Sequence, residues 1–114
     1  MKIVDKKIKL DLLDKMSKKM FGGLVKAVVD IKKNIMVVGG EMHADEEKYL
    51  IENGSSQENL WGINLYPEFF GQENFIEYDS IINIRPRQNN FSRSVENKKI
   101  KEEIIKIVYQ LIEK

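Results

Sequence analysis

The sequence contains no cysteine, which excludes disulfide bonds, thiolate nucleophiles and metal sites built on cysteine ligands. It also lacks an apolar run of roughly 18 residues that could span a membrane, and residues 1–7 lack the apolar stretch of a signal peptide. We therefore expect a soluble, cytoplasmic protein without a membrane segment. P-loop, GxGxxG and HExxH motifs are missing as well, so the sequence indicates no cofactor and no metal.

The net charge of +1 conceals three blocks of opposite sign. Residues 1–40 carry ten Lys against four Asp, residues 41–84 carry ten acidic residues against one Lys, and residues 85–114 carry eight Lys or Arg against four Glu. The blocks therefore have net charges of +6, −9 and +4. The single histidine, His43, lies at the start of the acidic block, and all three arginines lie in the last block.

Hydrophobic periodicity predicts an α+β protein. At 114 residues, of which 42% are hydrophobic, the chain has the size of one globular domain, and we assign residues 1–114 to it. Helical spacing predicts helices over residues 10–20 and 45–53, with Asp45 as N-cap, and a last helix that Asn97 caps. Alternation and apolar runs predict strands over residues 3–4, 25–31, 35–38, 60–66, 75–79 and 81–85. This order favours an antiparallel, meander-type sheet of about five strands with two to three helices packed on it.

Three short segments together resemble a known family. They are Gly39-Gly40-Glu41-Met42-His43-Ala44-Asp45, Leu60-Trp61-Gly62-Ile63-Asn64-Leu65-Tyr66-Pro67 and Asp79-Ser80-Ile81-Ile82-Asn83-Ile84-Arg85-Pro86. In this order they are similar to a family of short prokaryotic proteins known only as a domain of unknown function. The resemblance covers nearly the whole chain. It implies a compact single domain and implies no reaction, substrate or cofactor.

His43 is the natural candidate for acid–base chemistry because an imidazole titrates near neutral pH. Glu41 and Asp45 lie two residues away on either side, so an extended backbone would place all three side chains on one face. Nearby carboxylates would then favour the imidazolium form of His43. The alternative is that Glu41 and His43 end a strand while Asp45 caps the following helix.

A second candidate site is the polar segment between the last two predicted elements. It contains all three arginines together with short polar side chains, namely Arg85, Arg87, Asn89, Asn90, Ser92 and Arg93. Guanidinium groups match carboxylates and phosphates in shape, and a loop of such donors can hold an anion. The alternative is a solvated loop whose arginines pair with the acidic block.

Strand alternation adds four residues to these candidates. Asn64 and Tyr66 share one face of their predicted strand, and Asn83 and Arg85 share one face of theirs. If the two faces coincide, a polar patch lies beside the arginine-rich loop and forms a ligand site. The alternative is an ordinary solvent-facing side of the sheet. Trp61 alternates with apolar neighbours, so we assign it to the core.

These residues support three hypotheses of function. The first is a non-enzymatic domain that binds a small anionic or phosphate-bearing ligand through Glu41, His43 and the polar residues named above. The second is a small phosphoester hydrolase or nuclease in which His43 works with an arginine. The third is a homodimer or larger assembly held by the oppositely charged blocks. The net charge of +1 and the lack of a known RNA- or DNA-binding motif argue against nucleic acid as partner.

Overall fold

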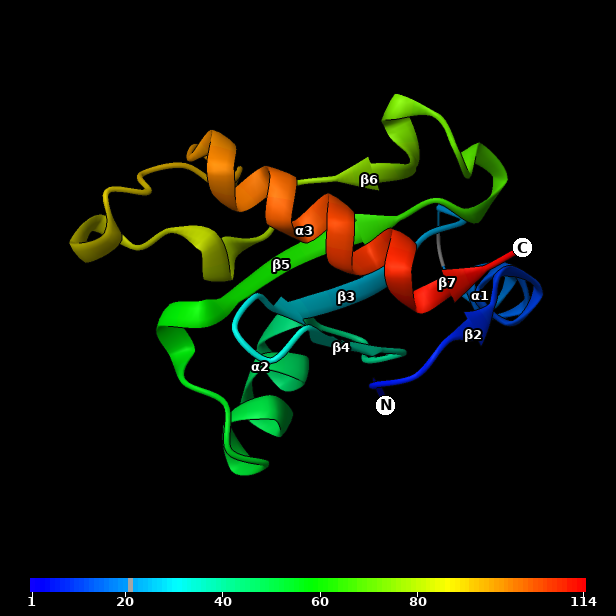
Figure 1. Ribbon diagram of the computed structural model, residues 1–114, viewed down its shortest axis with the longest axis horizontal. Helices are drawn as coiled ribbons and strands as arrows, with labels where there is room; N and C mark the ends of the chain where they lie inside the picture. Colours follow the sequence, from blue (N-terminus) through cyan, green and yellow to red (C-terminus); the bar gives the residue numbers. More distant parts are fainter. Residues whose placement is uncertain (21) are drawn as a thin grey trace.

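A computed structural model describes residues 1–20 and 22–114. Its centre is an antiparallel five-stranded sheet in the order β1-β4-β3-β5-β6 (Figure 1). The strands are β1 (Lys2–Val4), β3 (Val25–Asp30), β4 (Ile35–Val38), β5 (Leu60–Leu65) and β6 (Ile76–Glu77). With three helices packed on this sheet, the predicted α+β fold is confirmed.

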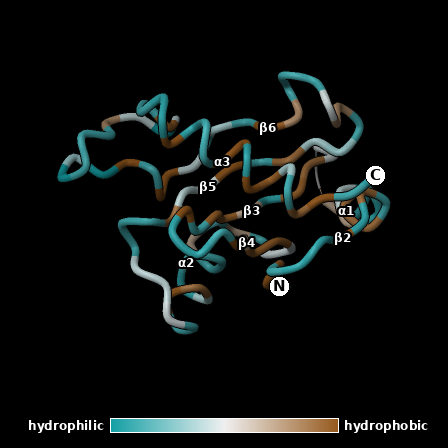
Figure 2. The backbone as a smooth tube through the Cα atoms, in the orientation of Figure 1, coloured by the Kyte–Doolittle hydropathy of each residue, from teal (hydrophilic) through white to brown (hydrophobic). Residues whose placement is uncertain are grey.

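Helices cover both faces of the sheet, because alternate side chains of each strand point to opposite sides. The helices are α1 (Leu10–Lys18), α2 (His43–Glu52) and α3 (Lys98–Leu111). On one face, Trp61 and Ile63 belong to a large core cluster that includes Ile104 of α3. On the other, Leu60 belongs to a small cluster with Leu50 of α2. The apolar residues of the strands and of α3 stand out along the chain in Figure 2.

Local signals in the sequence account for several of these elements. Asn34 has the left-handed φ of 57° that the predicted turn between β3 and β4 requires. The side chain of Asn97 accepts a hydrogen bond from the backbone N–H of Ile100 at 3.0 Å, so the predicted cap of α3 is confirmed. The apolar stripe of α3 faces the core, with Ile104 and Val108 completely buried.

Two short strands join the segments at the two ends of the described chain. β2 (Ile8–Lys9) and β7 (Ile112–Glu113) pair in parallel, and the carboxylate of Glu113 lies 2.9 Å from the ammonium nitrogen of Lys9. The side chains of Ile8 and Ile112 are buried in the large core cluster. This pairing brings the start of α1 close to the C-terminal end of α3 (Figure 1).

The prediction for residues 75–85 was wrong in part. Only Ile76–Glu77 is a strand, and short 3-10 helices precede and follow it at Glu73–Phe75 and Ile81–Asn83. Beyond Glu77 the chain leaves the strand path, and the side chain of Asn83 pairs with the edge of β5 in place of a further strand. Three further 3-10 helices lie at Gln57–Asn59, Pro67–Phe69 and Pro86–Gln88.

The predicted cap of α2 was also wrong. This helix begins at His43, and its N-cap is Met42, which makes no side-chain capping bond. Asp45 therefore lies inside the first turn, where its charge still suits the helix dipole. Among the described residues, no helix combines the length and the apolar character needed to cross a bilayer.

Candidate functional site

His43 lies in the first turn of α2 with its ring turned toward the sheet. It is only 7% exposed, and Nε2 lies 2.8 Å from the carbonyl oxygen of Ile63. Because a carbonyl only accepts, Nε2 carries the proton and donates it. Burial lowers the pKa of His43 below 6.5, with the charge of Lys26 acting in the same direction, so the ring is neutral at pH 7.

The expected common face of Glu41, His43 and Asp45 does not form. The helix begins at His43, so the extended backbone that would align the three side chains is interrupted there. Glu41 and Asp45 are exposed, whereas His43 is buried. Within residues 1–20 and 22–114, no three carboxylates and imidazoles gather closely enough to hold a metal ion.

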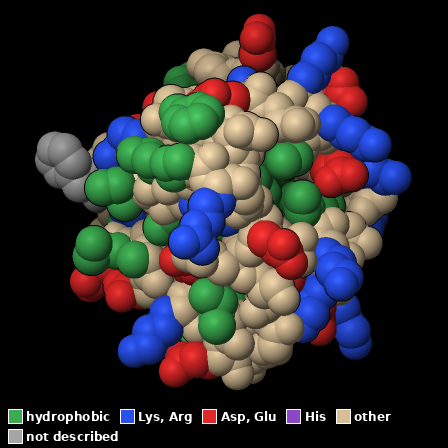
Figure 3. All heavy atoms as spheres, turned by 90° about the vertical axis from the view of Figure 1, so that its left-hand side faces the viewer, with side chains coloured by type: hydrophobic (Ala, Val, Ile, Leu, Met, Phe, Trp, Pro, Cys, Tyr) green, Lys and Arg blue, Asp and Glu red, His purple; other side chains and the backbone are tan. Residues whose placement is uncertain are grey.

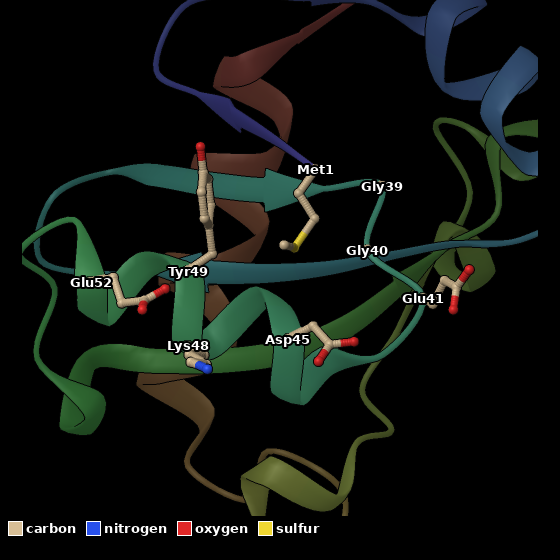
Figure 4. A pocket seen from close by; sticks show the side chains of 8 residues that line it. All are labelled: Met1, Gly39, Gly40, Glu41, Asp45, Lys48, Tyr49 and Glu52. Carbon is tan, nitrogen blue, oxygen red and sulfur yellow. The ribbon is translucent and has the colours of Figure 1, made fainter.

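Glu41 and Asp45 instead line an open pocket between α2 and the segment of Met1, Gly39 and Gly40 (Figure 4). The pocket has a volume of about 450 Å³. Its walls combine three carboxylates with one ammonium group and two apolar side chains, and they consist of Met1, Gly39, Gly40, Glu41, Asp45, Lys48, Tyr49 and Glu52. The surface there is acidic overall, so it does not suit the anionic ligand that the sequence suggested.

A buried acid that the sequence did not single out lies behind this pocket. Glu46 is completely buried, and its Oε2 accepts a hydrogen bond from the backbone N–H of Gly40 at 3.1 Å. Its Oε1 has no partner among the described residues. Burial raises the pKa of Glu46 to about 9, so the side chain is protonated at neutral pH. A Cβ at Gly40 would lie 2.5 Å from Cγ of Glu46, which explains why glycine occupies that position.

Asn64 of β5 and Tyr66, which directly follows this strand, both contact an acid from β6. The amide of Asn64 and the hydroxyl of Tyr66 both donate to Oε1 of Glu77, at 2.8 and 3.1 Å. Next to them, Nε of Arg93 lies 2.6 Å from Oδ1 of Asp79, whose charge acts on His43. The structure therefore brings together four of the predicted site residues, His43, Asn64, Tyr66 and Arg93.

Asn83 and Arg85 lie elsewhere, along the free edge of β5. The guanidinium of Arg85 donates to the carbonyls of Gln57 and Leu60 and lies over the ring of Trp61, 4.0 Å from its centroid. His43 and Arg85 thus donate hydrogen bonds to the carbonyls of Ile63 and Leu60, which are three residues apart on β5, or about 10 Å along the strand. The shared cleft that the hydrolase hypothesis needs is not formed by these two groups.

The loop from Ser80 to Val95 is built on two buried asparagines. The side chain of Asn83 bonds both the N–H and the C=O of Gly62, at 2.8 and 2.9 Å. The side chain of Asn90 donates to three loop carbonyls and accepts from the N–H of Glu96. Through these contacts Asn83 and Asn90 stabilise the backbone of the loop and fix its shape.

The other loop residues that the sequence suggested as ligands, Arg87, Asn89 and Ser92, are exposed, and a carboxylate of the chain itself already binds the backbone N–H groups that could hold an anion. Asn89 has a left-handed conformation at φ 58°. The backbone N–H groups of Phe91 and Ser92 both donate to Oε2 of Glu96, at 2.7 and 2.8 Å. These bonds lower the pKa of Glu96. The chain's own carboxylate therefore occupies the place expected for an anionic ligand.

A second pocket, which the sequence did not indicate, lies between α3 and the segment around β6. We call it the tyrosine pocket; it has a volume of about 440 Å³ and is lined in part by Glu73, Ile76, Tyr78, Lys101, Ile105 and Tyr109. The ammonium of Lys101 lies 5.0 Å from the ring centroid of Tyr78. The hydroxyl of Tyr109 accepts a hydrogen bond from Gly71 N–H at 3.2 Å, which leaves its proton free to donate.

The electrostatics of the tyrosine pocket are set by half-buried phenols. Burial raises the pKa of Tyr78 to about 12, so the hydroxyl keeps its proton and acts as a donor at neutral pH. Tyr109 packs against Phe70 and Phe75 with ring centroids 5.3 and 5.6 Å apart. This aromatic cluster holds one wall of the pocket in place. The sequence did not reveal the tyrosine pocket because its walls come from two separate segments, residues 71–78 and 101–109.

Comparison with known proteins identifies a family. No curated protein and no solved structure matched the chain. The model of one family, described as "Protein of unknown function (DUF5674)", matches residues 2–111. The resemblance inferred from residues 39–45, 60–67 and 79–86, to a domain of unknown function, is thereby confirmed. Since the match spans nearly its whole length, the chain belongs to the DUF5674 family.

Proposed function

We propose that the chain is a small-molecule-binding domain and that its ligand is a flat apolar molecule carrying one anionic group. The binding site is the tyrosine pocket. Its volume of about 440 Å³ lies within the usual range for small-molecule sites. Ile76, Ile105 and the two tyrosine rings supply apolar walls for the body of the ligand.

The observation that carries this proposal is that three residues with hydrogen-bond donors line one largely apolar cavity. The ammonium of Lys101 lies over the ring of Tyr78, and Tyr78, Lys101 and Tyr109 line the same pocket. A carboxylate or phosphate would accept from all three, and the ammonium would offset its charge. Glu73 is the one acid in the lining, and it would weaken the binding of an anion.

The test uses benzoate as probe and benzyl alcohol as its uncharged counterpart, with amide chemical shifts as readout. We expect saturable shifts at the N–H of Gly71 with benzoate and weaker binding of benzyl alcohol. Lys101→Met should weaken the binding of benzoate roughly tenfold, about 1.4 kcal/mol, because it removes one charge-assisted contact. Glu73→Gln should strengthen the binding of benzoate, because it removes a negative charge from the lining.

Lys106→Met is the matched control, since it removes the same charge from the same helix outside the tyrosine pocket. It should leave the affinity for benzoate unchanged. Equal losses in the Lys101 and Lys106 variants would mean that only the overall charge matters. That result, or the absence of saturable shifts at Gly71, would refute the proposal.

A further inference from the structure

The loop from Ser80 to Val95 has a fixed shape although it contains little regular structure. Its two central asparagines, Asn83 and Asn90, are 0% and 2% exposed, and every one of their side-chain contacts is to a backbone group. A satisfied buried polar network of this kind selects one conformation. Whatever the loop presents to its surroundings is therefore held in place before any partner arrives.

Three of the side chains that the loop exposes are large and apolar. Ile81, Ile84 and Phe91 are 65%, 42% and 64% exposed, and we call them the apolar loop patch. Single exposed apolar side chains are common, whereas several on one preformed loop can serve an interaction surface. The loop forms one end of the molecule (Figure 1), and hydrophobic side chains gather among charged ones on that end (Figure 3).

One exposed base and one exposed acid belong to the apolar loop patch's immediate neighbourhood in the loop and its contacts. Arg87 is exposed and makes no ion pair within the described chain. Glu58 is exposed as well, and its backbone carbonyl accepts a hydrogen bond from the side chain of Gln88 at 2.9 Å. Arg87 directly precedes Gln88, so the exposed base and the exposed acid Glu58 both lie near this contact, at the rim of the same surface.

We propose that this surface binds a second copy of the chain through a two-fold axis. A two-fold contact uses the same patch on both partners, so the patch must complement itself. An apolar centre pairs with its own copy, and a rim with both signs lets Arg87 of each protomer face Glu58 of the other. A stable contact buries about 800 Å² per protomer, which is roughly an eighth of the 6806 Å² of exposed surface.

The preformed loop lowers the cost of this association. A flexible loop loses conformational freedom when it binds, and that loss subtracts from the affinity. Here the asparagine network has already fixed the backbone that carries Ile84 and Phe91. The dimer is independent of the tyrosine pocket, so either proposal can fail without the other.

Sedimentation velocity over micromolar to millimolar concentrations tests the dimer. We expect the wild type to pass from monomer to dimer in this range. Phe91→Ser should shift the midpoint to at least roughly tenfold higher concentration. Leu12→Ser is the matched control, because Leu12 is 39% exposed on α1, at the opposite end of the molecule (Figure 1), and should leave the midpoint unchanged.

A charge exchange tests the partner identity directly. Arg87→Glu alone and Glu58→Lys alone should each weaken the dimer, since each creates like charges across the axis. The double variant should restore it, which requires that the two positions face each other in neighbouring copies. Circular dichroism checks that every variant is folded. A wild type that stays monomeric throughout, or a double variant as weak as the single ones, would overturn the proposal, and a dimer unaffected by Phe91→Ser would place the contact elsewhere.

Discussion

Glu46 is a carboxylic acid enclosed between helix α2 and the backbone of Gly40. Burial raises its pKa from the ordinary 4.5 to about 9. Between these two values the folded state holds a proton that the unfolded state has released, so the stability of the protein falls as pH rises. The expected slope is about 1.4 kcal/mol per pH unit, reduced where other groups titrate.

We predict that Glu46→Gln removes this slope. Glutamine keeps the shape of the protonated acid and its acceptor for the N–H of Gly40. At about pH 8 the variant should be more stable than the wild type by at least about 1 kcal/mol, and the gap should widen toward about pH 9. Urea unfolding at several pH values measures the difference in stability between the two proteins and its dependence on pH. Parallel pH profiles for the two proteins would show that Glu46 is ionised in the folded state.

His43 acts in the opposite sense, in a pH window that lies below 6.5 and overlaps the lower part of the window of Glu46. Its pKa is lowered below 6.5 by burial, so the unfolded state binds a proton that the folded state rejects as pH falls through 6.5. Stability therefore decreases toward acid pH on account of His43 and toward alkaline pH on account of Glu46. Measurements from about pH 7 upward isolate the contribution of Glu46, because His43 is then neutral in both states.

At the scale of elements, the edge of β5 is paired in part by the side chain of Asn83, where a neighbouring strand would normally supply backbone hydrogen bonds. β6 pairs only with Asn64 and Leu65, and the amide of Asn83 takes over at Gly62 by donating to its C=O and accepting from its N–H. Truncating Asn83 to Ala leaves both backbone groups buried without partners. We predict a loss of about 3 kcal/mol in the free energy of unfolding.

The comparison variant for this prediction is Asn97→Ala, which removes the exposed cap of α3 and should cost only about 1 kcal/mol. Amide exchange gives the local readout, since the N–H of Gly62 should exchange much faster in Asn83→Ala and not in Asn97→Ala. Equal costs for the two asparagines would contradict the structural task assigned to Asn83.

The same edge shows what sequence patterns can and cannot reveal. Alternation located β3 and β5 to within a residue, and helical spacing located the core-facing stripe of α3, because both patterns report which side of an element is buried. A short apolar run located β4, because that strand is covered on both faces. Residues 81–85 carry a strand-like composition, yet Asn83 uses its side chain where a strand would use its backbone. Composition does not distinguish these two ways of pairing an edge.

The candidate sites were harder to predict because their chemistry depends on tertiary contacts. Nothing local separates Glu46 from Glu47, and only the packing against Gly40 makes one of them a buried acid. The guanidinium of Arg85 has the chemistry to bind an anion, but it already donates hydrogen bonds to the carbonyls of Gln57 and Leu60. Tyr78 and Tyr109 meet across the tyrosine pocket from distant parts of the chain.

At the scale of the whole molecule, one core cluster runs from Val4 near one end of the sequence to Ile112 near the other. Strand β7 carries Ile112, which is 3% exposed and pairs with Ile8 of β2, so it ties the segment before α1 to the end of α3. Because both helices pack on the same sheet face, we predict that the chain unfolds as one cooperative unit, which is the behaviour of a single domain.

Ile112→Ala tests this prediction far from the single tryptophan. The substitution should cost about 3 kcal/mol, the usual range for an isoleucine truncated in a core. If the core is one unit, the fluorescence of Trp61 in β5 and the far-ultraviolet circular dichroism of the helices should shift by the same amount and stay superimposable. A cooperative fold transmits the loss at β7 to β5 because the two share the same buried cluster. Transitions that separate in the variant would mean that α1, β2 and β7 unfold without the sheet, and the chain would then consist of two cooperative units.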